Sequence, residues 1–156
     1  MASRSLQLDL PDEAATAALG ARLAKACRAG DVIALHGDLA AGKTTLARSL
    51  VRFFAGSDTD VPSPTFTLVQ TYETPTLEIW HFDLYRLEMP EEAGELGLSE
   101  AVDGLALIEW PQRLGALLPQ TRLDVRLDFS GEGRIACLTD HHDWSARIDG
   151  DWRQSA

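Results

Sequence analysis

The sequence has few cysteines and no asparagine at all. Its two cysteines, Cys27 and Cys137, lie far apart and form no CxxC motif, so we expect two buried, reduced thiols rather than a disulfide. Without asparagine the chain cannot contain the N-K-x-D motif on which guanine recognition by GTPases usually depends. A GTPase is therefore disfavoured from the outset.

Basic residues are also scarce. Lysine and arginine together number 14 against 24 aspartates and glutamates, which gives a formal net charge of −10 and a pI near 4.7. A protein that neutralises nucleic-acid phosphates by itself normally presents a basic face. We therefore expect any RNA in the biology of this protein to be held by a partner.

Long apolar runs are missing as well. No stretch approaches the length of a membrane span, and the opening "MASRSLQLDLPDE" turns acidic before any run long enough for a signal peptide. We expect a cytoplasmic protein with no membrane association. A length of 156 residues predicts one domain over 1–156, with a loosely ordered tail from about residue 141.

The apolar pattern alternates between strand-like and helix-like segments. One helix is expected to open at Pro11-Asp12-Glu13, with the proline in its first turn, and a second to follow residue 43. Expected strands cover 5–10, 32–35, 67–72, 77–82, 105–108, 122–129 and 135–139. This order predicts an α/β fold: a P-loop NTPase-like three-layer sandwich with a mixed, mostly parallel central sheet and a C-terminal antiparallel hairpin.

The strongest motif is Gly37-x-x-x-x-Gly42-Lys43-Thr44, the spacing of a phosphate-binding P-loop. It lies between a predicted strand and a predicted helix, where backbone N–H groups and the helix dipole attract phosphate. Lys43 is expected to reach the β- and γ-phosphates, and the Thr44 hydroxyl to reach Mg²⁺. The sequence therefore predicts binding of a nucleoside triphosphate.

Two acidic residues are candidates for the metal and for catalysis. Glu109 follows the apolar run "LALI", and Asp83 lies in "HFDLYR". If that strand continued, His81, Asp83 and Tyr85 would share one face; we expect a functional Asp83 and structural roles for His81 and Tyr85.

Two further segments carry polar side chains. In "VPSPTF" a switch role for Thr65 and a plain turn are both open. We expect no metal site at His141-His142-Asp143, because adjacent histidines in a polar tail seldom converge on one ion.

Several segments together resemble one family. They are "GDLAAGKTT", "SPTFTLVQTY", "HFDLYRL" with "PEE" following, and "LIEWP", which run in order between about residue 8 and residue 120; "LPDEAAT" is similar too. The resemblance is to TsaE, formerly YjeE, the P-loop ATPase of bacterial tRNA threonylcarbamoyladenosine (t6A) biosynthesis. It implies binding of ATP or ADP with Mg²⁺ and docking on TsaB and TsaD, with tRNA contacted only indirectly. ATP hydrolysis would support turnover of that complex and would be slow without it.

The resemblance also implies roles for individual residues. Asp83 and Glu109 would be needed for ATPase activity together with Lys43, and Thr44, Asp83 and Glu109 would form the metal site. The expected nucleotide contacts are Glu13, Gly37, Asp38, Leu39, Ala40, Ala41, Gly42, Lys43, Thr44, Thr45, Trp110 and Gly133. The family usually has glycine where this chain has Ala40, and alanine fits there without strain only if φ stays negative.

The residues alone are also compatible with other functions of a P-loop. A small-molecule kinase would pass the γ-phosphate to a hydroxyl, although no cluster of arginines typical of a kinase lid follows the loop. A non-catalytic module would only lock its fold around a nucleotide. Phosphate release, with and without partners, distinguishes these cases.

Overall fold

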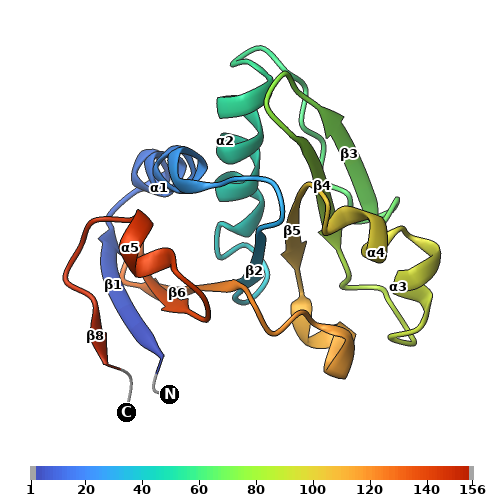
Figure 1. The fold of residues 1–156 in the computed structure, drawn as a ribbon. Helices are drawn as coiled ribbons and strands as arrows, with labels where there is room; N and C mark the ends of the chain where they lie inside the picture. Colours follow the sequence, from blue (N-terminus) through green and yellow to red (C-terminus); the bar gives the residue numbers. More distant parts are fainter. Residues whose placement is uncertain (1–2, 155–156) are drawn as a thin grey trace.

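A computed structural model describes residues 3–154 and shows an eight-stranded mixed sheet in the order β3-β4-β5-β2-β6-β7-β1-β8 (Figure 1). The strands are β1 (Arg4–Leu10), β2 (Val32–His36), β3 (Val69–Glu73), β4 (Glu78–Asp83), β5 (Leu105–Glu109), β6 (Leu123–Ser130), β7 (Gly133–Asp140) and β8 (Arg153–Gln154). The fold class expected from the sequence is confirmed, with helices on both faces of this sheet.

The parallel part of the sheet lies at its centre. Strands β4, β5, β2 and β6 run parallel to one another, and every residue of β5 is buried. These parallel strands are covered on both faces, and their sequences are therefore continuous apolar runs rather than alternating patterns. Antiparallel ladders extend the sheet to both edges: β3 pairs with β4, while β7, β1 and β8 continue from β6.

Helices form separate cores on the two faces. Helices α1 (Glu13–Ala26) and α2 (Lys43–Ala55) pack against each other and against the larger core, which includes Leu23, Leu46 and Leu50. Short elements cover the other face around Phe82 and Ile108. They are α3 (Glu92–Glu95), α4 (Leu98–Ala101) and the 3-10 segment η1 (Pro111–Leu117), none of which the sequence pattern predicted.

The ends of three elements differ from expectation for local reasons. Helix α1 begins after Asp12, whose carboxylate accepts the Ala15 N–H at 2.8 Å, so Pro11 precedes the cap instead of lying in the first turn. Strand β3 starts only at Val69, because a turn closed by a hydrogen bond from the Leu68 N–H to the Pro64 carbonyl occupies the preceding residues.

Strand β4 ends at Asp83, whose side chain accepts the N–H of Tyr85 at 3.1 Å. Tyr85 therefore lies in the following turn. The strand does not continue to residue 85, so Tyr85 does not share the face of His81 and Asp83.

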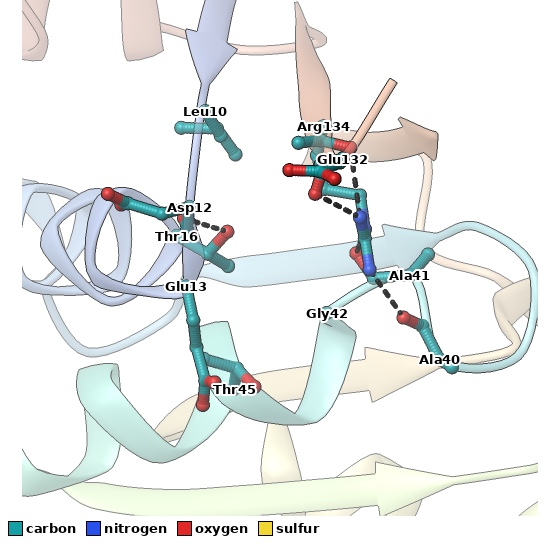
Figure 2. A pocket seen from close by; sticks show the side chains of 11 residues that line it. Leu10, Asp12, Glu13, Thr16, Ala40, Ala41, Gly42, Thr45, Glu132 and Arg134 are labelled. Atoms are coloured by element: carbon teal, nitrogen blue, oxygen red, sulfur yellow. Dashed lines mark hydrogen bonds between the residues drawn. The ribbon is translucent and has the colours of Figure 1, made fainter. Parts of the chain in front are cut away.

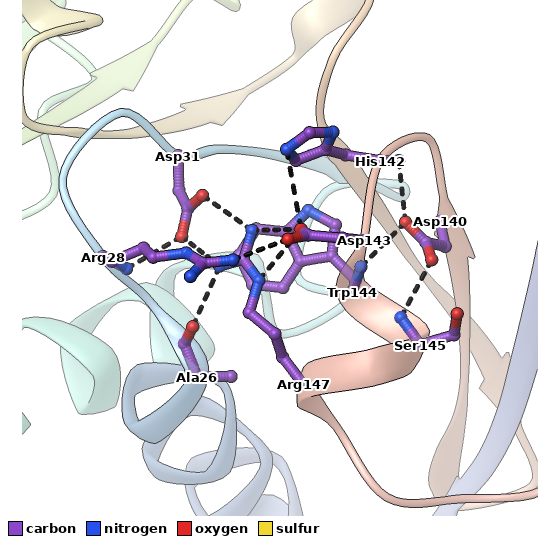
Figure 3. Close-up of polar contacts among 9 residues, drawn as sticks. All are labelled: Ala26, Arg28, Asp31, Asp140, His142, Asp143, Trp144, Ser145 and Arg147. Atoms are coloured by element: carbon purple, nitrogen blue, oxygen red, sulfur yellow. Dashed lines mark hydrogen bonds and ion pairs between the residues drawn. The ribbon is translucent and has the colours of Figure 1, made fainter.

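The C-terminal segment folds back onto the body of the protein through α5 (Trp144–Arg147) (Figure 3). Arg147 donates two hydrogen bonds to the Asp31 carboxylate, at 2.6 and 3.0 Å, and its guanidinium lies 4.1 Å from the centre of the buried Trp144 ring. The tail is thus packed by specific contacts, while its mobility stays a prediction. Within residues 3–154, no helix combines the length and apolarity that crossing a bilayer requires.

Candidate functional site

Three neighbouring parallel strands end at one edge of the sheet and bring their polar residues together there. The register pairs Glu109 of β5 with Leu35 of β2 on one side and with Asp83 of β4 on the other. The loop after β2 leads into α2, which begins at Lys43. Ligands of open α/β sheets bind at this carboxyl edge. The topology therefore places the P-loop and both candidate acids in one site.

The P-loop depends on its two glycines. Gly37 and Gly42 have φ of 146° and 108°, in the region that side chains disfavour, and a Cβ on Gly37 would lie 2.6 Å from the Leu127 carbonyl oxygen. Residue types and spacing alone predicted this geometry. The turn directs the start of α2 and its free N–H groups toward the cavity.

Lys43 is buried inside its own loop. Its ammonium group donates to the carbonyls of Gly37 and Asp38, the latter at 3.0 Å, and lies 4.1 Å from the centre of the Trp110 ring. Burial lowers the pKa of Lys43, and the neighbouring carboxylates of Glu109 and Asp83 oppose that shift. A phosphate entering here would replace weak carbonyl partners with a full negative charge.

Glu109 is the central acid of the site and is only 2% exposed. The Thr44 hydroxyl donates to its carboxylate at 3.2 Å, and His81 Nε2 lies 2.6 Å from its other oxygen. Threonine and glutamate in direct contact at the start of α2 are suited to share one hard cation, because Mg²⁺ prefers oxygen ligands.

Asp83 lies beside Glu109, also buried, and it contacts the proline-flanked segment. The Thr65 hydroxyl donates to one Asp83 oxygen at 2.9 Å and hydrogen-bonds with Ser63 at 2.8 Å. The structure thus brings Thr65 into the site, so a switch role for it is geometrically available. A cavity of about 220 Å³ is lined by Leu39, Ala40, Ala41, Gly42, Lys43, Thr44, Thr45, Thr65, Asp83, Glu109 and Trp110.

A second cavity, of about 270 Å³, adjoins the first across the loop (Figure 2). Ala40, Ala41, Gly42 and Thr45 line both cavities. The remaining lining residues of the second are Leu10, Asp12, Glu13, Thr16, Glu132, Gly133 and Arg134. Glu13 and Gly133, which the resemblance placed near the nucleotide, are therefore both at this opening.

Sequence reasoning missed Arg134 and Asp12 as members of this cavity. Arg134 reaches it because β7 pairs with β1 from Arg134 to Asp140, with Arg134 opposite Leu10. No motif in the sequence signals that pairing. Asp12 had a usable signal, since an aspartate just before an apolar helical pattern is a typical N-cap.

Ala40 does not meet the condition under which alanine fits this position without strain. Its φ is 65°, in the left-handed region, so the loop holds a conformation that is costly for alanine. Figure 2 shows the guanidinium of Arg134 against this turn, where it donates to the carbonyls of Ala40 and Ala41, both at 3.1 Å. Contacts from a distant hairpin hold the turn in place.

The adjacent histidines of the tail lie outside the site. His141 Nε2 is 2.8 Å from a carboxylate oxygen of Asp124, whose other oxygen is 2.8 Å from His36 Nε2. Among residues 3–154, no three or more histidine, cysteine, aspartate or glutamate side chains are grouped so as to hold a metal ion. A metal in the candidate site would accordingly have two carboxylates and the Thr44 hydroxyl, with other ligands from phosphate or water.

Comparisons with known proteins match this chain to one family. The family model described as "Threonylcarbamoyl adenosine biosynthesis protein TsaE" matches residues 10–136, which include the P-loop, both acids, β6 and the first half of β7. The chain belongs to the TsaE family. Membership implies a role in t6A biosynthesis.

Individual relatives cover most of the chain. A TsaE from Rickettsia felis is 43% identical over 131 residues, which cover 83% of this chain and 77% of the relative. A TsaE from Bacillus subtilis is 37% identical over 124 residues, covering 78% of this chain and 75% of the relative. The crystal structure of Bacillus subtilis YdiB superposes with a TM-score of 0.78 at 27% identity, covering 94% of this chain and 92% of that one.

Proposed function

We propose that this TsaE family member binds and hydrolyses Mg·ATP in the cytoplasm as the ATPase component of the t6A machinery. It docks on the TsaB–TsaD complex and supports its turnover, with tRNA held by those partners. One observation carries the proposal: Lys43, Thr44, Asp83 and Glu109 meet at the edge of three parallel strands, around a cavity that opens beside the P-loop.

The two cavities fit the two ends of a nucleotide. The triphosphate would lie along the loop, where the N–H groups at the start of α2 and the Lys43 ammonium group supply the positive potential. Thr44, Glu109 and Asp83 would hold the metal, which would neutralise charge on the transferred phosphoryl group. Glu109 would also orient an attacking water. The base and ribose would enter the cavity of Figure 2, between Glu13 and Gly133.

The surface around the opening supports a protein partner. Phe66 is 79% exposed and Leu39 60%; Leu39 lines the phosphate cavity, and Phe66 directly follows Thr65, which also lines it. Arg86 lies over Phe66 at 4.4 Å. Large apolar side chains at a site's rim are typical of protein interfaces. The net charge of −10 agrees with a partner, rather than this chain, carrying the tRNA.

Calorimetry with Mg·ATP tests the binding step directly. We expect measurable heat for the wild type and a loss of affinity of about 10–100-fold for Lys43→Ala, since a hydrogen bond to a charged group contributes roughly 1.5–3 kcal/mol. Ser49→Ala is the control, because Ser49 lies one turn beyond Thr45 on α2 and lines neither cavity. No heat with folded wild-type protein would refute the proposal.

Phosphate release with and without TsaB and TsaD tests the remaining steps. We expect slow hydrolysis alone and marked acceleration by the partners, because completion of a phosphoryl-transfer site in trans can supply about 10³–10⁵ in rate. A pull-down in the presence of ATP should recover TsaB–TsaD with wild type and far less with Phe66→Ser. Transfer of the γ-phosphate to a small molecule would instead favour a kinase.

A further inference from the structure

His81 is fully buried and touches the site without lining its cavity. It lies on β4, two residues before Asp83, and opposite Leu107 of β5, which is two residues before Glu109. Its Nε2 is 2.6 Å from Glu109 Oε2. The Thr44 hydroxyl is nearer the other oxygen, Oε1, at 3.2 Å against 3.4 Å to Oε2. The carboxylate is therefore held from two sides.

The second ring nitrogen of His81 decides which way the hydrogen bond runs. Nδ1 is buried and has no hydrogen-bond partner. When Glu109 is ionised its oxygens only accept, so in this contact the proton lies on Nε2 and is donated to Glu109. A proton on Nδ1 as well would leave a buried N–H without an acceptor, which costs more than a bare ring nitrogen. The contacts therefore favour a ring that donates from Nε2 and leaves Nδ1 bare.

We propose that His81 is a positioning residue of the ATPase site. By donating from Nε2 it occupies Oε2 of Glu109 and fixes the rotation of the carboxylate, so that Oε1 faces Thr44 and the metal position. This inference rests on the proposed function, because it specifies how one acid of that site is oriented. Residues that orient the groups around a metal commonly affect metal affinity or activity by about 10–100-fold when replaced. The sequence predicted a structural role for His81, and the experiments below distinguish that role from the positioning role proposed here.

Two amide variants separate the positioning role from simple packing. The side-chain nitrogen of glutamine lies about as far from the backbone as Nε2 of histidine, whereas that of asparagine corresponds to Nδ1. His81→Gln therefore keeps a donor within reach of Glu109, and His81→Asn removes it. Both variants replace the ring with an uncharged amide. A difference between them therefore reports the position of the donor and not the loss of the ring.

The two variants and the wild type are compared with TsaB and TsaD present. We expect His81→Gln to retain kcat within a few-fold, and His81→Asn to lose about 10–100-fold in kcat with little change in the KM for ATP. His81→Asn should also need a higher Mg²⁺ concentration for half-maximal nucleotide binding. Thermal unfolding checks that both variants are folded. Equal losses in the two variants, or no loss in either, would overturn the positioning role.

Nitrogen-15 NMR of the ligand-free protein gives a readout that does not depend on activity. The His81 signal, assigned by its absence in His81→Gln, should show the proton on Nε2; a proton on Nδ1 alone would refute the hydrogen bond. If wild-type protein neither binds nor hydrolyses ATP, the proposed function fails, irrespective of the variants. If wild type is active and only the Gln–Asn difference is missing, the inference on His81 fails alone.

Discussion

The guanidinium of Arg134 donates a hydrogen bond of 3.1 Å to the carbonyl of Ala40, a residue 94 positions earlier that adopts φ of 65°. A second bond of the same length reaches the Ala41 carbonyl. The planar fork of an arginine suits two consecutive carbonyls better than a lysine would. A hairpin at the far end of the sequence thus stabilises the strained turn of the P-loop.

Relief of that strain gives the first prediction. Ala40→Gly should raise the free energy of unfolding by up to about 1 kcal/mol, because the left-handed conformation costs alanine roughly 1–2 kcal/mol, partly offset by the greater chain entropy of unfolded glycine. Urea denaturation measures it. Ala41→Gly is the control: Ala41 is buried and has no left-handed φ, so glycine there should destabilise. A loss of stability in Ala40→Gly would contradict the strain.

The second prediction concerns coupling between Arg134 and Ala40. Arg134→Gln should weaken ATP binding and lower stability by about 1–2 kcal/mol in the native sequence, through the lost hydrogen bonds. In an Ala40→Gly background the same replacement should cost at least about 0.5 kcal/mol less, since residues in contact are not additive. A double-mutant cycle from calorimetry and urea denaturation measures the coupling. Additive effects would show that Arg134 acts independently of the turn.

The third prediction is a pH dependence of stability at Asp124. Burial alone raises the pKa of this carboxyl, but hydrogen bonds from His36 and Arg122 outweigh it and hold the pKa well below its usual range. A carboxyl whose folded pKa is depressed stabilises the protein above its unfolded pKa of about 3.9, and loses that contribution as the pH falls toward the folded value.

Asp124→Asn tests this dependence. The difference in unfolding free energy between wild type and variant should be largest above about pH 5 and should shrink between pH 4 and pH 2. Urea denaturation across that range measures the difference. Asp128→Asn changes an exposed carboxylate on the same strand and should show little effect at any pH. A difference in unfolding free energy that stays constant with pH would contradict the lowered pKa of Asp124.

The fourth prediction concerns the C-terminal segment. Arg147→Ala would leave the buried Asp31 carboxylate without its bidentate partner and should cost about 3 kcal/mol, as removal of one member of a buried pair does. Arg153→Ala removes a pair in which both side chains are mostly exposed, and should cost less than about 1 kcal/mol. Urea denaturation compares them. Similar small effects would show that the tail is loosely held.

The sequence by itself determined the local parts of this protein. Glycines at fixed spacing between an apolar run and a helical pattern specify the P-loop, because the loop needs only its own backbone and its neighbours in the chain. Continuous apolar runs likewise predicted strands at β2 and β5, and Glu109 as the residue at the end of β5. These features depend on short-range sterics and on burial, which a linear sequence displays.

Only the tertiary structure decided what lies against these parts. Strand β7 pairs with β1, which brings Arg134 to Ala40; β4 pairs with β5, which brings His81 to Glu109. Strand pairing and register are set by long-range packing on both faces of the sheet. The sequence of one strand therefore does not reveal which strand it pairs with. For the same reason the strain at Ala40 and the orientation of Glu109 became visible only in the folded molecule.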